Sequence, residues 1–219
     1  MKYLFSLICF AGLTSSVMAQ DVVEKVSTCE AMNEESGALP AFGEQATANL
    51  SNTATLPGYE TKTVKVKLTG IVYEADGITP AKDVVLYIEQ ANEEGEYEIV
   101  SSADHKQVNH SGMVKTDANG TYTFYTFIPG HTKEKLAYQR TKRAEHIHLL
   151  VKEPGKQVYD LPAFVFDNDF MVTKYYKKRL KKLGYDNVLT LEESDGVQVA
   201  QKNIVLKASR VEDTRMASK

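Results

Sequence analysis

The feature that most constrains this fold is an alternation of apolar and polar residues that returns along the chain between turn signals. The segment TVKVKLTGIVY, residues 63–73, alternates in this way and is interrupted at Gly70. Alternation with a period of two is typical of a strand with one buried face, and a glycine inside it indicates a bulge. Further strand-like segments occur at 83–90, 122–127, 147–152 and 164–166. Short strands at regular spacing predict a mainly β protein, folded as an antiparallel β-sandwich.

Two turn signals divide this pattern. In DANG, residues 117–120, the glycine stands where the backbone needs a positive φ, which predicts a hairpin between residues 114–116 and 122–127. Asp195-Gly196 gives a similar signal between VLTLEE and VQVAQKNIVL, both strand-like.

One helix is expected in the C-terminal half of the chain, in TKYYKKRLKKLG. Thr173 is a candidate N-cap, and Gly184 stands where a C-terminal glycine cap belongs. Tyr176, Leu180 and Leu183 form one apolar stripe. The lysines would suit a nucleic-acid or membrane patch, but a solvated helix face with cations favoured in its last turn is the interpretation adopted.

The first residues are typical of a secretory signal peptide. Lys2 precedes the apolar stretch 3–13, and Val17-Met18-Ala19 is a cleavage site of the A-x-A type. Residues 1–19 are therefore expected to be removed, and the mature protein is expected to be exported, periplasmic or extracellular, without a membrane anchor.

The mature chain divides into three parts. Weak periodicity predicts an extended N-terminal arm at 20–61, the sandwich domain follows at 62–207, and 208–219 is a polar tail. Only Cys29 is left after cleavage, so the chain has no intramolecular disulfide framework. Loss of Lys2 changes the net charge from −3 to −4, which gives no electrostatic footprint for nucleic acid. Sheet edges and the arm would allow a homo-oligomer.

The candidate functional residues centre on RAEHIHLLV, residues 143–151. Alternate side chains of a strand point to one face, so His146 and His148 would lie together, about 7 Å apart at a rise of about 3.3 Å per residue. Two such imidazoles can converge on one ion, although ordinary surface or core histidines would give the same pattern. All five histidines fall between residues 105 and 148, which favours a site for Zn, Cu, Fe or Ni.

Four segments occur in an order that resembles one enzyme family. They are GIVYEADGITPAKDVVLYIEQANEEGEY, VKTDANGTYTFYTFIPGH, RAEHIHLLVKEPG and FVFDNDF. Together they look like the intradiol ring-cleavage dioxygenases, the catechol and protocatechuate dioxygenase type, and above all their short, exported, single-domain members. The resemblance covers roughly residues 62–206, and its most specific parts are T-D-x-x-G-x-Y-x-F at 116–124 and R-x-x-H-x-H at 143–148.

The resemblance implies an oxidoreductase of aromatic compound catabolism that opens catechol-type rings with O2 at a non-haem iron. The family holds Fe(III) with two histidines and two tyrosines, and His146 and His148 match the histidine ligands. Arg143 matches the active-site arginine, which would stabilise negative charge on the substrate. A salt bridge with Glu145 or another acid is the alternative role of Arg143. The expected partners are a small aromatic diol and O2.

The sequence departs from the family at both tyrosines. Thr132 stands after IPGH where one tyrosine ligand belongs, and residues 101–105, where the other is expected, contain none. The candidate third ligands are His131, Tyr138, Tyr97 and His105, with Asp104 as a carboxylate. Without two phenolates, Fe(II), Cu or Zn would also suit the site, or the metal would be lost, and ferric protein would carry little colour.

Two further interpretations depend on the same segments. Asp167 and Asp169 in FDNDF are interpreted as a turn before the helix, because a calcium site needs several more oxygens. The alternative function is a non-catalytic binding module, since GIVYEADGITPAKDVVLYI and TDANGTYTF also resemble transthyretin-like and carboxypeptidase-regulatory-like β domains. Loss of the tyrosine ligands would fit that role.

Overall fold

The computed structural model describes residues 22–26, 42, 47–101, 106–136 and 139–207. The structure does not describe the predicted signal peptide, half of the predicted arm, the polar tail, or Cys29, Asp104, His105 and Tyr138.

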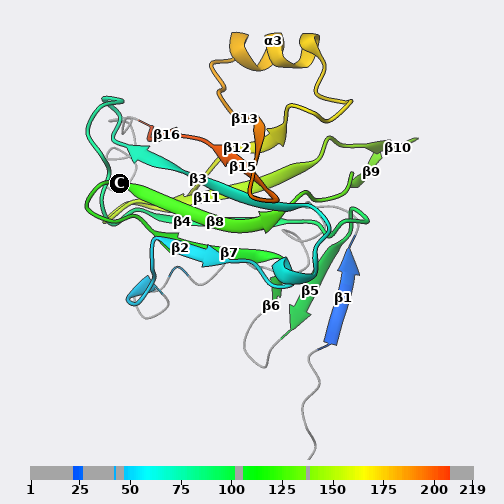
Figure 1. The fold of residues 1–219 in the computed structure, drawn as a ribbon, viewed down its shortest axis with the longest axis horizontal. Coiled ribbons are helices and arrows are strands. Elements are labelled where there is room, and N and C mark those ends of the chain that lie inside the picture. The colour runs from blue at the N-terminus through cyan, green and yellow to red at the C-terminus, as the bar shows by residue number, and fades with distance from the viewer. Residues whose placement is uncertain (1–21, 27–41, 43–46, 102–105, 137–138, 208–219) are drawn as a thin grey trace, which may run out of the picture.

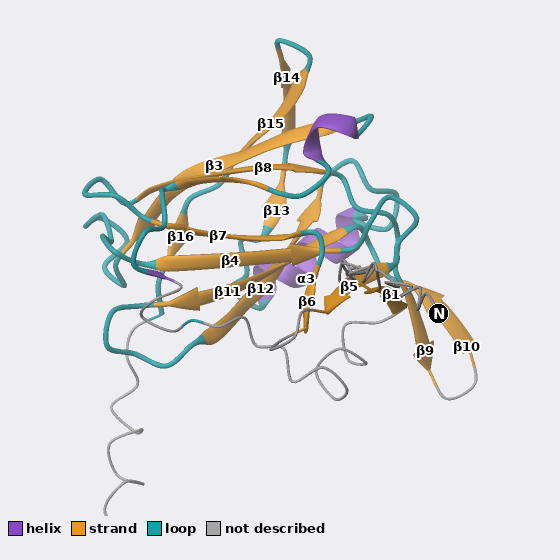
Figure 2. Ribbon diagram, turned by 90° about the horizontal axis from the view of Figure 1, so that it is seen from below, coloured by secondary structure: helices purple, strands orange, loops and turns teal. Residues whose placement is uncertain are grey.

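Two packed sheets form the body of the molecule (Figures 1 and 2). Within the described residues, the first sheet has the order β13 (Val188–Leu189), β12 (Tyr159–Phe166), β11 (His146–Lys152), β4 (Val85–Gln90), β7 (Ser111–Lys115). The second has the order β14 (Leu191–Ser194), β15 (Val197–Gln201), β3 (Lys65–Tyr73), β8 (Thr121–Phe127), β2 (Thr53–Thr55), and β16 (Ile204–Val205) also pairs with β3.

The apolar faces of the two sheets meet in one core. Leu68 and Phe124 from the second sheet are fully buried against Ile88 and Ile147 from the first. Removal of this apolar surface from water is the main force that holds the layers together. Because alternate residues of a strand face opposite ways, the core position of Ile147 turns its two neighbouring histidines to the outer face of the first sheet. The predicted mainly β sandwich is confirmed.

Parallel pairs make the sandwich mixed rather than purely antiparallel. The β12–β11, β11–β4, β4–β7 and β3–β8 pairs are antiparallel, but β2 is parallel to β8, β13 to β12, and both β15 and β16 to β3. The β2 strand and the buried Leu56 belong to the segment predicted as an arm. A short 3-10 helix, η1 (Tyr59–Thr61), then leads into β3.

The turn at residues 117–120 forms as predicted, with Gly120 at φ +68°. Asp117 holds it by accepting the backbone N–H groups of Asn119 and Thr121 at 2.9 and 3.0 Å. The predicted hairpin is wrong, because β7 pairs with β4 whereas β8 pairs with β3. The turn carries the chain from one sheet to the other. By contrast, β14 and β15 do form a hairpin around Asp195-Gly196.

The predicted bulge at Gly70 is also wrong. β3 pairs with β8 without a register shift, and Gly70 lies opposite Tyr122. A Cβ atom at Gly70 would lie 1.8 Å from the carbonyl oxygen of Lys202, which itself accepts the hydroxyl of Tyr122 at 2.7 Å. The glycine therefore permits a close backbone approach, the other common reason for glycine inside a strand.

We expect Gly70→Ala to lower the free energy of unfolding by about 1–3 kcal/mol, because the added methyl group overpacks a rigid backbone contact. Urea denaturation measures this loss. Gly112→Ala in β7 is the matched control, since the nearest atom to its Cβ would be the end of the flexible Leu56 side chain, at 3.1 Å, rather than a backbone atom. Equal losses in both variants would contradict the close-approach explanation.

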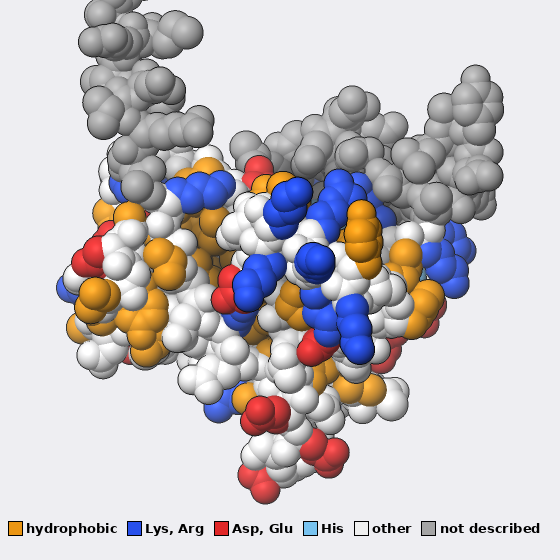
Figure 3. Space-filling view, turned by 90° about the horizontal axis from the view of Figure 1, so that it is seen from above, with side chains coloured by type: hydrophobic (Ala, Val, Ile, Leu, Met, Phe, Trp, Pro, Cys, Tyr) orange, Lys and Arg blue, Asp and Glu red, His pale blue; other side chains and the backbone are white. Residues whose placement is uncertain are grey.

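The predicted helix is α3 (Lys174–Lys182), and both of its predicted caps are confirmed. The Thr173 hydroxyl accepts the N–H of Tyr176 at 3.2 Å, and Gly184 has φ +78°. No residue of α3 is buried. Figure 3 shows its lysines and arginine as a cationic area, with the acidic tip of the β14–β15 hairpin projecting beside it. In the part of the chain that is described, no helix is long and apolar enough to cross a membrane.

Two smaller sheets lie at the end of the sandwich where β11 begins (Figures 1 and 2). One contains β1 (Val22–Val26), β5 (Tyr97–Ser101) and β6 (Lys106–Val108) in that order. The other is the hairpin of β9 (Lys133–Leu136) and β10 (Gln139–Lys142). Their position brings β5 close to the histidines of β11.

Candidate metal centre

The two histidines of the R-x-x-H-x-H segment lie on β11, between β12 and β4. The pairing with β4 is regular, but the pairing with β12 shifts register between Ile147 and Leu149. Pro162 and Ala163 of β12 together lie opposite His148 as a result. Proline lacks the N–H that a regular ladder needs, which explains the irregularity at this place. Such irregularities often re-aim side chains next to functional sites.

Three donor atoms meet on the outer face of the first sheet. The Nε2 atoms of His146 and His148 are 3.1 Å apart, and their rings are nearly perpendicular. The hydroxyl oxygen of Tyr97, the first residue of β5, lies 3.3 Å from Nε2 of His146. Tyr97 is fully buried and His146 is 6 % exposed. The predicted sharing of one face by the two histidines is thus what the structure shows. Of the two candidate third ligands that the structure describes, Tyr97 and His131, it brings Tyr97 to the pair.

The proton of the neutral His146 ring can be placed from its other nitrogen. Nδ1 of His146 lies 2.7 Å from the carbonyl oxygen of Ala144, which can only accept a hydrogen bond. Nδ1 therefore carries the proton, and Nε2 presents a lone pair towards Tyr97 and His148. A carbonyl bonded to the far nitrogen is the usual partner of a metal-binding histidine.

Burial keeps both imidazoles neutral. It lowers the pKa of His146, and the Arg143 charge adds to this effect against the opposing Ala144 hydrogen bond. Burial also lowers the pKa of His148 to about 3, with further contributions from His146 and Arg143. Arg143 itself is exposed, with its backbone N–H bonded to the carbonyl of Thr132 at 2.9 Å. Near neutral pH the pair therefore offers lone pairs rather than positive charge.

These donors fit a non-haem iron. Two nitrogens that bind one ion at about 2.0–2.1 Å lie about 2.9–3.4 Å apart for bond angles from a right angle to the tetrahedral angle. The observed 3.1 Å between the imidazole nitrogens falls in this range. No group of three or more His, Cys, Asp or Glu side chains among the described residues is placed to hold a metal. The third protein donor here is instead a phenol, the ligand type that suits a ferric ion.

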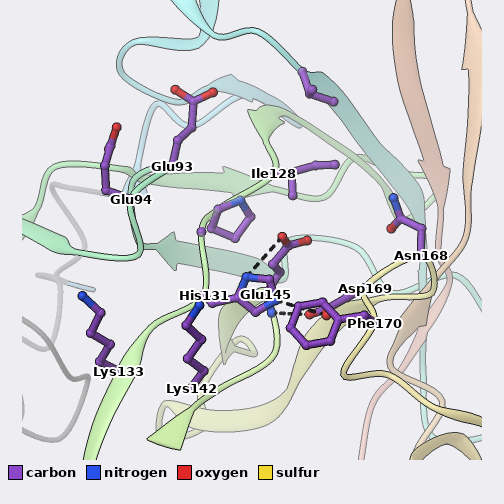
Figure 4. Close-up of a pocket in the computed structure, with 13 residues that line it drawn as sticks. Glu93, Glu94, Ile128, His131, Lys133, Lys142, Glu145, Asn168, Asp169 and Phe170 are labelled. Atoms are coloured by element: carbon purple, nitrogen blue, oxygen red, sulfur yellow. Dashed lines mark hydrogen bonds and ion pairs between the residues drawn. The ribbon is translucent and has the colours of Figure 1, made fainter. Parts of the chain in front are cut away.

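His131 belongs to a different cluster, shown in Figure 4. Its Nε2 lies 3.2 Å from Asp169 Oδ1, its Nδ1 lies 3.7 Å from Glu145 Oε1, and its ring contacts Phe170. These residues line an open pocket of about 690 Å³, which also receives Lys133 and Lys142 from the β9–β10 hairpin. The structure therefore directs both nitrogens of His131 to acids, away from the histidine pair, and directs Glu145 towards His131.

The remaining sequence candidates are either buried residues with structural contacts or residues outside the described part of the chain. Nδ1 of His110 lies 3.1 Å from the carbonyl oxygen of Pro57, and its ring packs edge-on against Phe127. Thr132, at the position where the family has a tyrosine, is buried. His105, Asp104 and Tyr138 lie outside the described residues.

One contact of Asp169, close to the histidine pair, was not anticipated from the sequence. Asp169 does form the predicted turn, because its Oδ1 accepts the N–H of Met171 at 2.8 Å. Its Oδ2 also accepts the N–H of Glu145 at 2.7 Å, immediately before the histidine pair. No spacing signal in the sequence links two residues 24 positions apart.

These observations define the class of protein: it is a β-sandwich with two histidines and a tyrosine gathered on the outer face of one sheet. The Dioxygenase family model matches residues 38–216. The chain belongs to the intradiol dioxygenase family.

Solved structures share the fold at low sequence identity. The dioxygenase domain of a dioxygenase carbohydrate-binding protein fusion from Streptomyces sp. SirexAA-E matches with TM-score 0.50 and 20 % identity, covering 71 % of this chain and 87 % of that one. Catechol 1,2-dioxygenase from Acinetobacter sp. ADP1, inhibited by bound mercury, matches with TM-score 0.54 and 16 % identity, covering 73 % and 58 %. Catechol 1,2-dioxygenase from Pseudomonas arvilla C-1 gives TM-score 0.54 and 19 % identity, covering 74 % and 58 %.

The match thus spans little more than half the length of these two catechol 1,2-dioxygenases. No curated protein matches the sequence.

Proposed function

We propose that this protein opens the ring of catechol-type diols between the two hydroxylated carbons, with O2, at a non-haem iron held by His146, His148 and Tyr97. The observation that carries the proposal is the convergence of two neutral imidazole nitrogens, 3.1 Å apart, with a phenol oxygen 3.3 Å from one of them. The family and the shared fold support the same reaction class. The predicted signal peptide supports a place of action outside the cytoplasm.

Each of these side chains has a role that follows from its surroundings. His146 and His148 would bind the metal through Nε2, and the Ala144 carbonyl keeps the His146 proton on Nδ1. Tyr97 would give up its hydroxyl proton, and its phenolate would offset the charge of a ferric ion. When bound, Fe(III) supplies Lewis-acid binding of the diol and promotes the reaction of its ring with O2.

Arg143 is suited to interact with substrate charge. The exposed guanidinium acts electrostatically on both histidines, and the Thr132 carbonyl fixes its backbone. A fixed cation beside a reacting centre stabilises negative charge that develops there. Arg143 would therefore orient an anionic diol and favour build-up of charge as the ring opens.

The direct test combines metal analysis with an oxygen assay. Purified protein loaded with iron should bind about one ion per chain and consume O2 with catechol, giving a ring-opened diacid. With ¹⁸O2, both labelled atoms should appear in the product. Stoichiometric metal without oxygen uptake across a panel of catechols would refute the activity and favour a binding module on the same sandwich.

A further inference from the structure

The peptide unit between Ala144 and Glu145 is hydrogen-bonded at both of its polar groups. Its carbonyl oxygen lies 2.7 Å from Nδ1 of His146. Its N–H donates to Oδ2 of Asp169, also at 2.7 Å. Because the C=O and N–H of a trans peptide point in opposite directions within the peptide plane, the imidazole and the carboxylate lie at opposite edges of one peptide unit. A continuous chain of hydrogen bonds thus leads from Asp169 through this peptide to the His146 ring.

The carboxylate at the far end of this chain is held firmly. The Asp169 side chain is fully buried. Its second oxygen, Oδ1, accepts the N–H of Met171 at 2.8 Å and faces Nε2 of His131 at 3.2 Å. Its backbone is tied to Phe166 and Val172. The loop between β12 and α3 therefore presents Oδ2 to the start of β11 in a fixed direction.

We infer that Asp169 is a positioning residue for the metal centre: through the Ala144–Glu145 peptide it holds the His146 proton on Nδ1 and leaves Nε2 free to bind. This inference rests on the proposed function for its metal, but every hydrogen bond of the Asp169–peptide–His146 series joins protein atoms only. The inference assigns Asp169, the second acid of FDNDF, a role that formation of the turn before α3 does not require.

Two physical effects give Asp169 this influence. A carboxylate that accepts an amide N–H polarises the peptide, which makes the carbonyl at the other end a stronger acceptor. A stronger carbonyl acceptor favours the Nδ1–H form of the imidazole and raises the electron density at Nε2. Removal of a partner bonded directly to a metal ligand commonly lowers metal affinity by about 10- to 100-fold. Asp169 acts through one further peptide, so its effect should lie near the lower end of that range.

Asp169→Asn in the full chain is the decisive variant. An amide has one acceptor oxygen, so an asparagine that keeps the Met171 and His131 contacts must turn its NH2 group towards the Glu145 N–H. The series of hydrogen bonds would then begin with two N–H donors facing each other, and it would lack the negative charge of the carboxylate. Asp167→Asn is the matched control, because Asp167 lies two residues away and its side chain pairs with Lys177 on the surface.

The first measurement uses metal-free protein with ¹⁵N-labelled histidine. Long-range ¹H–¹⁵N spectra report which ring nitrogen of His146 carries the proton, with the signals assigned through His146→Asn. We expect the Nδ1–H form in the wild type and in Asp167→Asn, and a substantial Nε2–H population in Asp169→Asn. An Nε2–H form in the wild type would overturn the inference, whether or not Asp169→Asn folds.

The second measurement is calorimetric titration with Zn²⁺ alone. We expect Asp169→Asn to bind the ion about tenfold more weakly than the wild type, and Asp167→Asn to match the wild type. An unchanged tautomer with unchanged affinity in Asp169→Asn would overturn the inference. If the wild type binds neither Zn²⁺ nor iron but its tautomer still depends on Asp169, the proposed function fails while the hydrogen-bond chain is supported.

Discussion

His148→Ala is expected to abolish stoichiometric iron binding and, with it, oxygen uptake on catechols. The variant leaves one imidazole and one phenol, and direct ligands count for more than the outer partners whose loss commonly lowers affinity by about 10- to 100-fold. We therefore expect metal affinity to fall by more than about 100-fold. The His148 ring lies on the outer face of β11, away from the core formed by Ile147 and Leu149, so the free energy of unfolding should change little. Metal analysis after desalting and thermal unfolding measure the two effects.

His131→Ala is the matched control for this loss. His131 is a histidine of the same region, but its nitrogens face Asp169 and Glu145 rather than the proposed metal ligands. We expect this variant to keep its iron. Loss of iron in both variants would mean that His131 supports iron binding, either as a ligand or through its contact with Asp169. Retention of iron in His148→Ala would remove the histidine pair from the site.

Local sequence patterns predicted the features of the fold that depend on residues close together in the chain, namely strand faces and helix ends. Alternation in β3 and β11 determined which side chains face the core, because the side-chain period of a strand is fixed. Thr173 and Gly184 marked the ends of α3 because helix ends need particular side chains and dihedral angles. Each of these signals involves residues that are close in the chain.

Strand pairing was predicted less well, because it depends on contacts between distant residues. The turn at Asp117–Gly120 reverses the chain, yet the strands on its two sides enter different sheets. The carbonyl of Lys202 explains Gly70, and nothing near Gly70 in the sequence indicates that contact. The parallel pairing of β2 with β8 brings in residues that have no strong periodicity of their own.

The candidate site shows the same division. His146 and His148 could be found because one strand carries both, two residues apart. The sequence could name Tyr97 only as one of several candidate third ligands. The packing of β5 against β11 places its hydroxyl next to the histidine pair, and no local pattern predicts that packing. Asp169 was interpreted only as a turn residue, because its contact with Glu145 crosses from the loop after β12 to the start of β11.

Tyr97→Phe is expected to remove the visible colour of the ferric protein. The sequence predicted little colour because both family tyrosines were unmatched, but the structure places the Tyr97 hydroxyl 3.3 Å from His146 Nε2 and so revises that expectation. A phenolate bound to Fe(III) gives a charge-transfer band, which phenylalanine cannot supply. The ring itself is kept, so only about 1 kcal/mol of stability should be lost with the hydroxyl. We expect kcat to fall at least about tenfold, equivalent to about 1.4 kcal/mol of barrier.

Tyr159→Phe separates this effect from the general loss of a tyrosine hydroxyl. The Tyr159 hydroxyl donates to Glu153 at 2.9 Å, and Tyr159 pairs with Val151, towards the other end of β11 from His146. That variant should keep both the band and the activity. Treatment with a chelator should bleach the wild type, and iron should restore the colour to the wild type but not to Tyr97→Phe. An equally strong band in Tyr97→Phe would mean that another phenolate binds the iron, with Tyr138 as the next candidate, and the ligand set proposed here would have to be replaced.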